Sequence, residues 1–139
     1  MSHLLIQPVI LLMLLTMCVW LYMYYLRIGF SLKNKINAQN LSSPEKCNSL
    51  LPDVVNQPSN NFKNLFEAPV IFYVVCVLLV VTNNSDMVFV YLAWAYVALR
   101  IIHSLIHCTF NNVMARFFTY FISSIVMWVM VCKFAYISL

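Results

Sequence analysis

Four long apolar segments constrain the fold of this chain more than any other feature of its sequence. They cover residues 4–27, 65–82, 87–108 and 115–138, and a helix needs about 20 apolar residues to cross the hydrocarbon core of a bilayer. Of the 139 residues, 63% are hydrophobic and only 9% are charged, whereas a soluble domain carries about 25% charged residues. The composition therefore predicts an integral membrane protein that is embedded in the lipid bilayer.

The segments favour helices over membrane strands. The chain has a single glycine, Gly29, and lacks the series of short alternating strands that a membrane barrel needs. A helix also satisfies its own backbone hydrogen bonds inside lipid. We expect one all-α domain over residues 1–139, folded as an up-and-down bundle of four membrane helices. The connection 28–63 contains Pro44, Pro52 and Pro58, and we expect a polar surface loop there rather than a continuous helix.

The distribution of basic residues predicts the orientation in the membrane. Lysine residues are concentrated in the connection 28–63, Arg116 closes the connection 109–116, and the short turn 83–86 contains no lysine or arginine. Connections rich in lysine and arginine stay on the cytoplasmic side, so we expect 28–63 and 109–116 to be cytoplasmic. The eight basic residues are too few and too dispersed for a nucleic-acid interface, and we exclude nucleic acid as a partner.

Ionisable residues inside the apolar segments are the main indication of function. Tyr96, Arg100, His103 and His107 recur three or four residues apart, so they share one face of a helix. A charged side chain near the bilayer centre costs about 2.5–3.5 kcal/mol on insertion scales, so this face must contact protein or water. We expect one polar layer near the cytoplasmic ends of the helices. Its members are Arg27, Asn64, Glu67, Arg100, His103, His107, Arg116 and Tyr120.

Several of these residues also have a purely structural interpretation. Arg27 and Arg116 could be interface anchors whose charged ends reach the head groups. Glu67 and Arg100 could form an ion pair that fixes helix packing, and Tyr120 could be a packing or interface residue. These interpretations remain open at the level of the sequence.

A metal or haem interpretation of the histidine pair is also possible. His103 and His107 are four residues apart on one helix face, a spacing that can ligate a metal or contact a haem. Haem bound in this way would require a histidine on another helix at the same depth, and the sequence offers none there. We therefore assign no metal ligand and rank this alternative last.

Two motifs connect the polar residues to a known family. The first is Asn64-Leu-Phe-Glu67 at the start of the second apolar segment. The second is Arg100-x-x-His103-x-x-x-His107, followed nine residues later by Arg116 and then by Tyr120. Together they resemble the MAPEG family, the membrane-associated proteins of eicosanoid and glutathione metabolism, and their spacing aligns with the prostaglandin E synthase branch without a gap.

The resemblance implies a homotrimer with glutathione-binding sites between neighbouring subunits. It implies a glutathione-dependent transferase or peroxidase that acts on lipophilic electrophiles, with Arg116 as the catalytic residue beside the thiolate. The residues that would bind glutathione by this resemblance are Arg27, which would reach the site from the adjacent subunit, Asn64, Glu67, Arg100, His103, His107 and Tyr120.

The sequence also departs from the family pattern. Phe117 follows Arg116 where the prostaglandin E synthase branch has a serine, Ala68 follows Glu67 where many members have tyrosine or threonine, and His107 replaces a frequent tyrosine. These differences predict a divergent bacterial member in the inner membrane and disfavour a serine-assisted isomerase reaction. The alternative function is a non-catalytic member of the same fold that binds a lipid or a partner protein.

Overall fold

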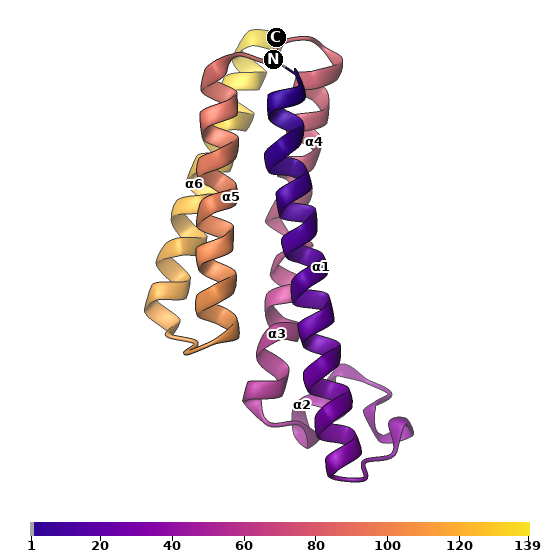
Figure 1. Ribbon diagram of the computed structural model, residues 1–139. Helices are drawn as coiled ribbons and strands as arrows, with labels where there is room; N and C mark the ends of the chain where they lie inside the picture. Colours follow the sequence, from indigo (N-terminus) through magenta and orange to yellow (C-terminus); the bar gives the residue numbers. More distant parts are fainter. Residues whose placement is uncertain (1) are drawn as a thin grey trace.

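A computed structural model describes residues 2–139, and within that range every regular element is a helix (Figure 1). The elements are α1 (Ser2–Lys33), the short 3₁₀ helix η1 (Ala38–Leu41), α2 (Pro44–Leu50), α3 (Asp53–Asn64), α4 (Ala68–Val81), α5 (Met87–Cys108) and α6 (Val113–Ser138). Four stretches are long and apolar enough to cross a membrane, namely His3–Lys33, Asp53–Val81, Met87–Cys108 and Val113–Ser138. The expected all-α membrane architecture is therefore confirmed.

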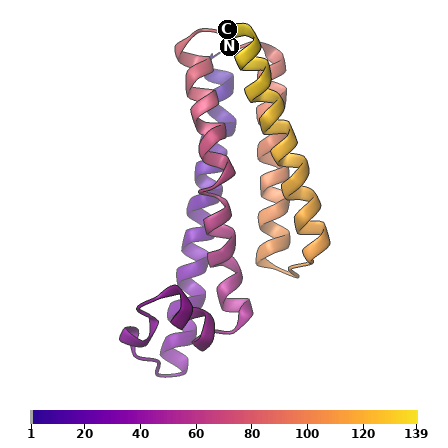
Figure 2. The same ribbon diagram turned by 180° about the vertical axis from the view of Figure 1, so that it is seen from behind.

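The helices form two packed pairs. α1 packs along α3 and α4, while α5 and α6 form a hairpin with the most extensive contact in the molecule. The two termini and the turn between α4 and α5 lie at one end, and the turn between α5 and α6 lies toward the other (Figures 1 and 2). We call these the terminal end and the loop end. Both lysine- or arginine-containing connections thus lie at the loop end, as the up-and-down topology requires.

The connection 28–63 is more helical than the sequence led us to expect. α1 continues to Lys33, and η1, α2 and α3 occupy most of the remainder. Pro44 opens α2 and Pro52 immediately precedes α3, which are positions where a missing backbone N–H costs little. The Ser43 side chain accepts a hydrogen bond from the backbone N–H of Lys46 and caps α2. Pro44 and Pro52 therefore separate short helices here instead of preventing them, while Pro58 lies inside α3.

A break between α3 and α4 sets the position of the polar residues. The ring of Pro69, in the first turn of α4, would clash with the carbonyl of Leu65 in a continuous helix. The helix therefore stops at Asn64 and restarts at Ala68, with Glu67 at the N-cap in a non-helical conformation (φ −92°, ψ −95°). The second membrane helix consequently begins three residues later than expected, and Asn64 and Glu67 flank its break.

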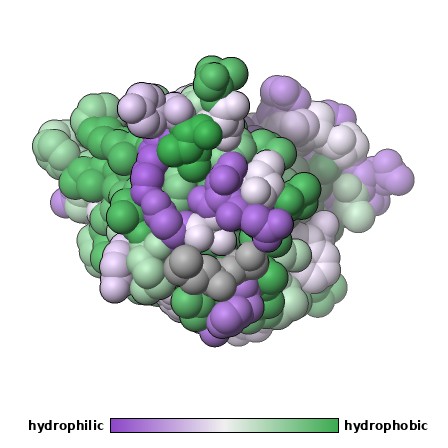
Figure 3. Space-filling view, turned by 90° about the horizontal axis from the view of Figure 1, so that it is seen from above, coloured by the Kyte–Doolittle hydropathy of each residue, from purple (hydrophilic) through white to green (hydrophobic). Residues whose placement is uncertain are grey.

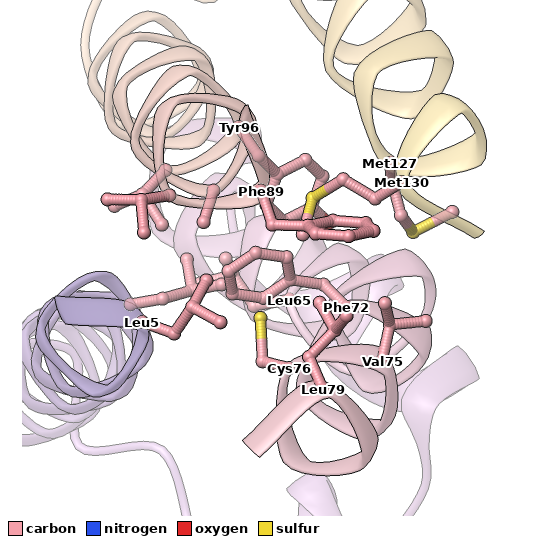
Figure 4. Packing of buried hydrophobic residues seen from close by; sticks show 14 of the residues in the cluster. Leu5, Leu65, Phe72, Val75, Cys76, Leu79, Phe89, Tyr96, Met127 and Met130 are labelled. Carbon is pink, nitrogen blue, oxygen red and sulfur yellow. The ribbon is translucent and has the colours of Figure 1, made fainter. Parts of the chain in front are cut away.

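The apolar core lies between the two helix pairs (Figure 4). The ring of Phe72 in α4 stacks on that of Tyr96 in α5, with centroids 4.5 Å apart and planes inclined by 26°. Phe89 is fully buried nearby, and Met127 and Met130 extend toward it from α6 (Figure 4). These large side chains fill the core from the middle of the bundle to its terminal end.

An ion pair closes the terminal end. Asp86 caps α5 by accepting a hydrogen bond from the Phe89 backbone N–H (3.0 Å), and its other carboxylate oxygen accepts from Lys133 Nζ of α6. Lys133 Nζ also lies 4.3 Å from the centroid of the Phe89 ring. Hydrophilic residues gather near the middle of this end, within a border of hydrophobic ones (Figure 3).

Candidate functional site

A cavity opens in the loop-end half of the bundle, where the α3–α4 break faces α5 and α6. Its volume is about 460 Å³, within the range of small-molecule sites. The lining residues are Asn60, Lys63, Asn64, Glu67, His103, His107, Val113, Arg116, Phe117 and Tyr120. The structure thus brings together six of the predicted site residues: Asn64, Glu67, His103, His107, Arg116 and Tyr120.

Arg116 is held in the cavity wall by two hydrogen bonds from one nitrogen. Its Nη1 donates to Oδ1 of Asn111 (2.8 Å) and lies 3.2 Å from Nε2 of His107. Because a guanidinium group can only donate, Nε2 of His107 is the acceptor. The side chain of Arg116 is half-buried, so its remaining donors are available to a ligand in the cavity.

His103 connects α5 to α6 through its ring. Its Nδ1 lies 3.0 Å from the backbone carbonyl oxygen of Arg116. Since the carbonyl accepts, Nδ1 carries the proton, and Nε2 of the neutral ring is left as an acceptor. Nε2 is enclosed by protein and has no hydrogen-bond partner among residues 2–139. One ring nitrogen of His103 therefore fixes the helix pair while the other stays unsatisfied.

Arg100 is fully buried and does not line the cavity itself, but it lies against Tyr120, which does. Its guanidinium carbon lies 4.5 Å from the ring centroid of Tyr120 and 5.2 Å from that of Tyr96. None of its three guanidinium nitrogens has a hydrogen-bond partner in the described part of the chain. The two aromatic faces offset part of the desolvation cost, but no acidic side chain within residues 2–139 pairs with this guanidinium.

The ion pair considered between Glu67 and Arg100 is not formed. Among residues 2–139, the only ion pair is the one between Lys133 and Asp86. Glu67 is exposed and lines the cavity instead. The carboxylate of Glu67 is thus available to a ligand in the cavity.

Two lining residues on α3, Asn60 and Lys63, are absent from the sequence-based set. Asn60, Asn64 and Glu67 are spaced by four and three residues, a helical pattern that could have revealed them. The pattern was overlooked because the connection 28–63 was interpreted as a loop. Next to them, Asn61 is fully buried and fastens α3 to α5, since its Oδ1 accepts from Ser104 Oγ at 3.3 Å.

Arg27 lies outside this cavity. It is on α1, where its Nη2 donates to Ser59 Oγ at 2.9 Å, and it lines a separate recess at the loop end. Within one subunit, the structure does not bring Arg27 to the other predicted residues. The depth of Arg27 near the end of the first membrane segment agrees with the sequence, but its neighbours are those of α2 and α3.

The side chains of the cavity suit a small ligand with several charges. Lys63 and Arg116 supply positive charge, Glu67 supplies negative charge, and Asn60 and Asn64 supply amide groups. Val113 and Phe117 give the opposite wall an apolar surface. No cluster of three histidine, cysteine, aspartate or glutamate side chains within residues 2–139 could hold a metal ion. The arrangement therefore favours a ligand with carboxylates, an ammonium group and an apolar neighbour.

Comparison with known proteins identifies the family of the chain. The model of the MAPEG family matches residues 5–136, nearly the whole chain. No curated protein and no solved structure matches the chain significantly. Because the family model covers all four membrane helices and the whole polar cavity, the chain belongs to the MAPEG family and is a multi-pass membrane protein with a general role in glutathione or eicosanoid metabolism.

Proposed function

We propose that this protein is a glutathione-dependent transferase or peroxidase that acts on lipophilic electrophiles, with its site in the cavity between α3–α4 and α5–α6. Glutathione carries two carboxylates and one ammonium group, so its site needs at least two cations and one anion. Lys63 and Arg116 supply the cations and Glu67 the anion. The cavity of about 460 Å³ is large enough for a tripeptide.

The buried, unpaired charge of Arg100 is the observation that carries this proposal. Removing one partner of a buried ion pair costs about 3–5 kcal/mol because an uncompensated charge is left behind. A fully buried guanidinium with no hydrogen-bond partner among the described residues is in that position. A carboxylate of glutathione that passes Tyr120 to reach Arg100 would neutralise this charge. Arg100 would then be a binding residue together with Asn64, Glu67, His103, His107 and Tyr120.

Arg116 is the residue that we assign to activation of the thiol. A free thiol has a pKa of about 8.5, and lowering it by about two units requires roughly 2.7 kcal/mol of preferential stabilisation of the anion. A guanidinium group at hydrogen-bond distance in a partly dry site supplies stabilisation of that size. Asn111 and His107 hold Arg116 in the wall, so no side-chain reorganisation is needed when the thiolate forms.

The acceptor substrate would enter from the bilayer. Phe117 lines the cavity and is also 56% exposed on the outer surface of α6. Its ring stacks on that of Phe121, one turn further along, with centroids 5.9 Å apart. These rings form an apolar edge between cavity and lipid, which suits a hydrophobic epoxide, unsaturated carbonyl or hydroperoxide.

We further propose a homotrimer in a bacterial inner membrane, with the loop end in the cytoplasm. Many large apolar side chains of α1 and α6 are exposed in the single chain, and these face either lipid or other subunits. A neighbouring subunit could also bring its Arg27 to the glutathione site. Placing the loop end in the cytoplasm opens the cavity to the compartment whose thiol pool is glutathione.

The proposal is tested by ultraviolet difference absorbance of glutathione bound to purified protein in mild detergent. Wild type should show the absorbance of a bound thiolate at neutral pH and conjugate a lipophilic electrophile. Arg116→Ala should lose the thiolate signal and most activity, because the anion is no longer stabilised. Lys133→Ala is the matched control, since it removes one cation from the other end of the same helix. Full activity in Arg116→Ala would refute the assignment.

A binding protein without turnover is the second candidate. It is favoured by the two hydrogen bonds that already engage Arg116 Nη1 and by the apolar Phe117 next to it. In that case glutathione or a lipid binds in the cavity, but no conjugate or reduced peroxide forms. Retention on immobilised glutathione without turnover of any electrophile would support this candidate over the enzyme.

A further inference from the structure

The short turn between α5 and α6 contains an asparagine that the path of the backbone does not require (Figure 1). Asn111 has a φ of 46°, a left-handed conformation that glycine adopts freely and that other residues adopt rarely. Its backbone N–H donates to the carbonyl oxygen of Ile106 at 2.8 Å and closes the last turn of α5. Glycine could make the same turn, so the side chain of Asn111 is not needed for the turn itself.

The side chain of Asn111 holds Arg116 instead. Its Oδ1 accepts from Nη1 of Arg116 at 2.8 Å, a shorter contact than the 3.2 Å between the same nitrogen and Nε2 of His107. Arg116 lies in the first turn of α6, whose N-cap residue, Asn112, accepts a hydrogen bond from the backbone N–H of Ala115. The turn therefore supplies one asparagine to cap α6 and a second to hold the arginine that faces the cavity.

Both acceptors that hold Arg116 are uncharged. An amide oxygen and a neutral imidazole satisfy Nη1, and no acidic side chain within residues 2–139 forms an ion pair with this guanidinium. A carboxylate at position 111 could accept the same hydrogen bond, but its negative charge would oppose the formation of a second anion nearby. Because both contacts use Nη1, the donors on Nη2 and Nε remain for a ligand. The guanidinium is thus oriented without losing its charge.

We propose that Asn111 is a positioning residue that orients Arg116 toward the sulfur of glutathione while leaving the positive charge of Arg116 uncancelled. Asn111 does not line the cavity, so it acts through Arg116 and does not touch the ligand. This inference rests on the proposed function, because the thiolate is the group that Arg116 stabilises there. Without the Oδ1 contact the guanidinium would be free to turn away, and the bound thiol would ionise less readily.

Asn111→Gly separates the role of the side chain from that of the turn. Glycine tolerates the left-handed backbone, so the variant should keep its helix content and unfold close to the wild-type temperature. The pKa of the bound glutathione thiol, measured from thiolate absorbance against pH, should rise by about one unit. Below both pKa values the kcat should fall by up to about ten-fold, with KM nearly unchanged because Lys63 and Glu67 still bind the tripeptide. At alkaline pH the kcat should return toward the wild-type value.

Two more variants make this test specific. Asn83→Gly is the matched control, because Asn83 also has a positive φ, of 56°, but lies in the turn between α4 and α5 at the terminal end. This control should match wild type in thiol pKa and kcat. Asn111→Asp keeps an oxygen acceptor and a residue that tolerates the left-handed backbone, but it adds a negative charge beside Arg116. It should raise the thiol pKa at least as much as Asn111→Gly does, although Arg116 stays held.

The order of the Arg116 side chain can be measured without glutathione. The chain has only three arginines, Arg27, Arg100 and Arg116, so nitrogen NMR of arginine-labelled protein in detergent can follow each guanidinium. Rotation of the Arg116 guanidinium should be slow in wild type and in Asn111→Asp, and faster in Asn111→Gly.

The outcomes separate this inference from the proposed function. Unchanged Arg116 rotation in Asn111→Gly, a wild-type thiol pKa in either Asn111 variant, or an equal shift in Asn83→Gly would each overturn the positioning role while the enzyme assignment stands. Absence of bound thiolate in wild type would overturn the proposed function and the positioning role together, whatever the mobility of Arg116.

Discussion

The two ends of the bundle differ in whether their charged and polar side chains have hydrogen-bond partners. At the terminal end, Asp86 caps α5 and pairs with Lys133, so these two charged side chains have partners. At the loop end, Arg100 has no hydrogen-bond partner in the described chain, and one ring nitrogen of His103 is also unsatisfied. Packing alone explains the first arrangement. The second is costly without a ligand, which is why we propose the site at the loop end.

The aromatic core lies between the two ends, and its Tyr96 ring has contacts on both sides. Tyr96 stacks on Phe72 on the core side and faces the guanidinium of Arg100 on the other. The same tyrosine therefore contacts both the well-packed aromatic core and the buried Arg100. Mutations on either side of this ring should separate stability from ligand binding.

The largest effect on stability should come from the core side of this boundary. Phe72→Ala removes a fully buried ring and leaves a cavity beside Tyr96, which should cost about 3–5 kcal/mol. Unfolding in mixed micelles, followed by helix content, measures this loss. Phe118→Ala is the control, because Phe118 is 53% exposed and its removal should change stability little. Equal destabilisation by both variants would contradict the assigned core.

On the polar side, Arg100→Met should reduce ligand binding but not stability. Replacing a buried charge with an apolar side chain of similar length is often neutral or stabilising by about 1–4 kcal/mol. Loss of charged hydrogen bonds to glutathione should weaken its binding by about 100-fold, the equivalent of roughly 2.7 kcal/mol. Calorimetric titration and thermal unfolding measure the two quantities. Marked destabilisation with intact glutathione binding would make Arg100 a structural residue.

These contrasts also explain how much of the fold could be predicted from the sequence. Apolar length alone placed the membrane helices, since lipid tolerates few alternatives to a long helix. The break near Pro69 and the helices within 28–63 were not predicted. Both depend on tertiary packing, because the small core around Cys47 and Leu51 stabilises short helices that the polar local sequence does not favour.

The candidate site was predicted where one helix carried the signal. Tyr96, Arg100, His103 and His107 form a periodic stripe, and all four are buried. Asn60 and Lys63 were missed because their helix was not expected, and the neighbours of Arg27 depend on how α2 folds back. Spacing along one helix is readable from sequence, whereas the pairing of separate helices requires the three-dimensional structure.

A smaller effect on stability should come from the hydrogen bond that the His103 ring makes to α6. His103→Leu removes the hydrogen bond to the Arg116 carbonyl, and interhelical hydrogen bonds in membranes average about 0.6 kcal/mol, with a maximum of about 1.7. His103→Asn places an amide donor near the position of Nδ1 and should recover part of that loss. Unfolding midpoints of the two variants provide the test. Identical midpoints would show that this hydrogen bond contributes nothing to helix pairing.

The smallest predicted effect belongs to the terminal end and concerns pH. The hydrogen bond from Lys133, helped by the one from the Phe89 backbone, lowers the pKa of Asp86 below its ordinary value of 3.8. A lowered folded-state pKa means that this stabilisation is complete above the unfolded-state pKa and is lost as pH falls through the folded-state value. Because the Asp86 side chain is half exposed, the contribution should stay below about 1 kcal/mol.

Asp86→Asn isolates the charge from the helix cap. Asparagine can still accept the hydrogen bond from the Phe89 backbone N–H, since it is as good an N-cap as aspartate. Wild type should therefore be slightly more stable than the variant near neutral pH, and the difference should disappear as the pH falls through the folded-state pKa of Asp86. Chemical unfolding across this range measures the difference. A constant difference at every pH would assign the stabilisation to the cap, and the terminal end would then depend on backbone geometry instead of charge pairing.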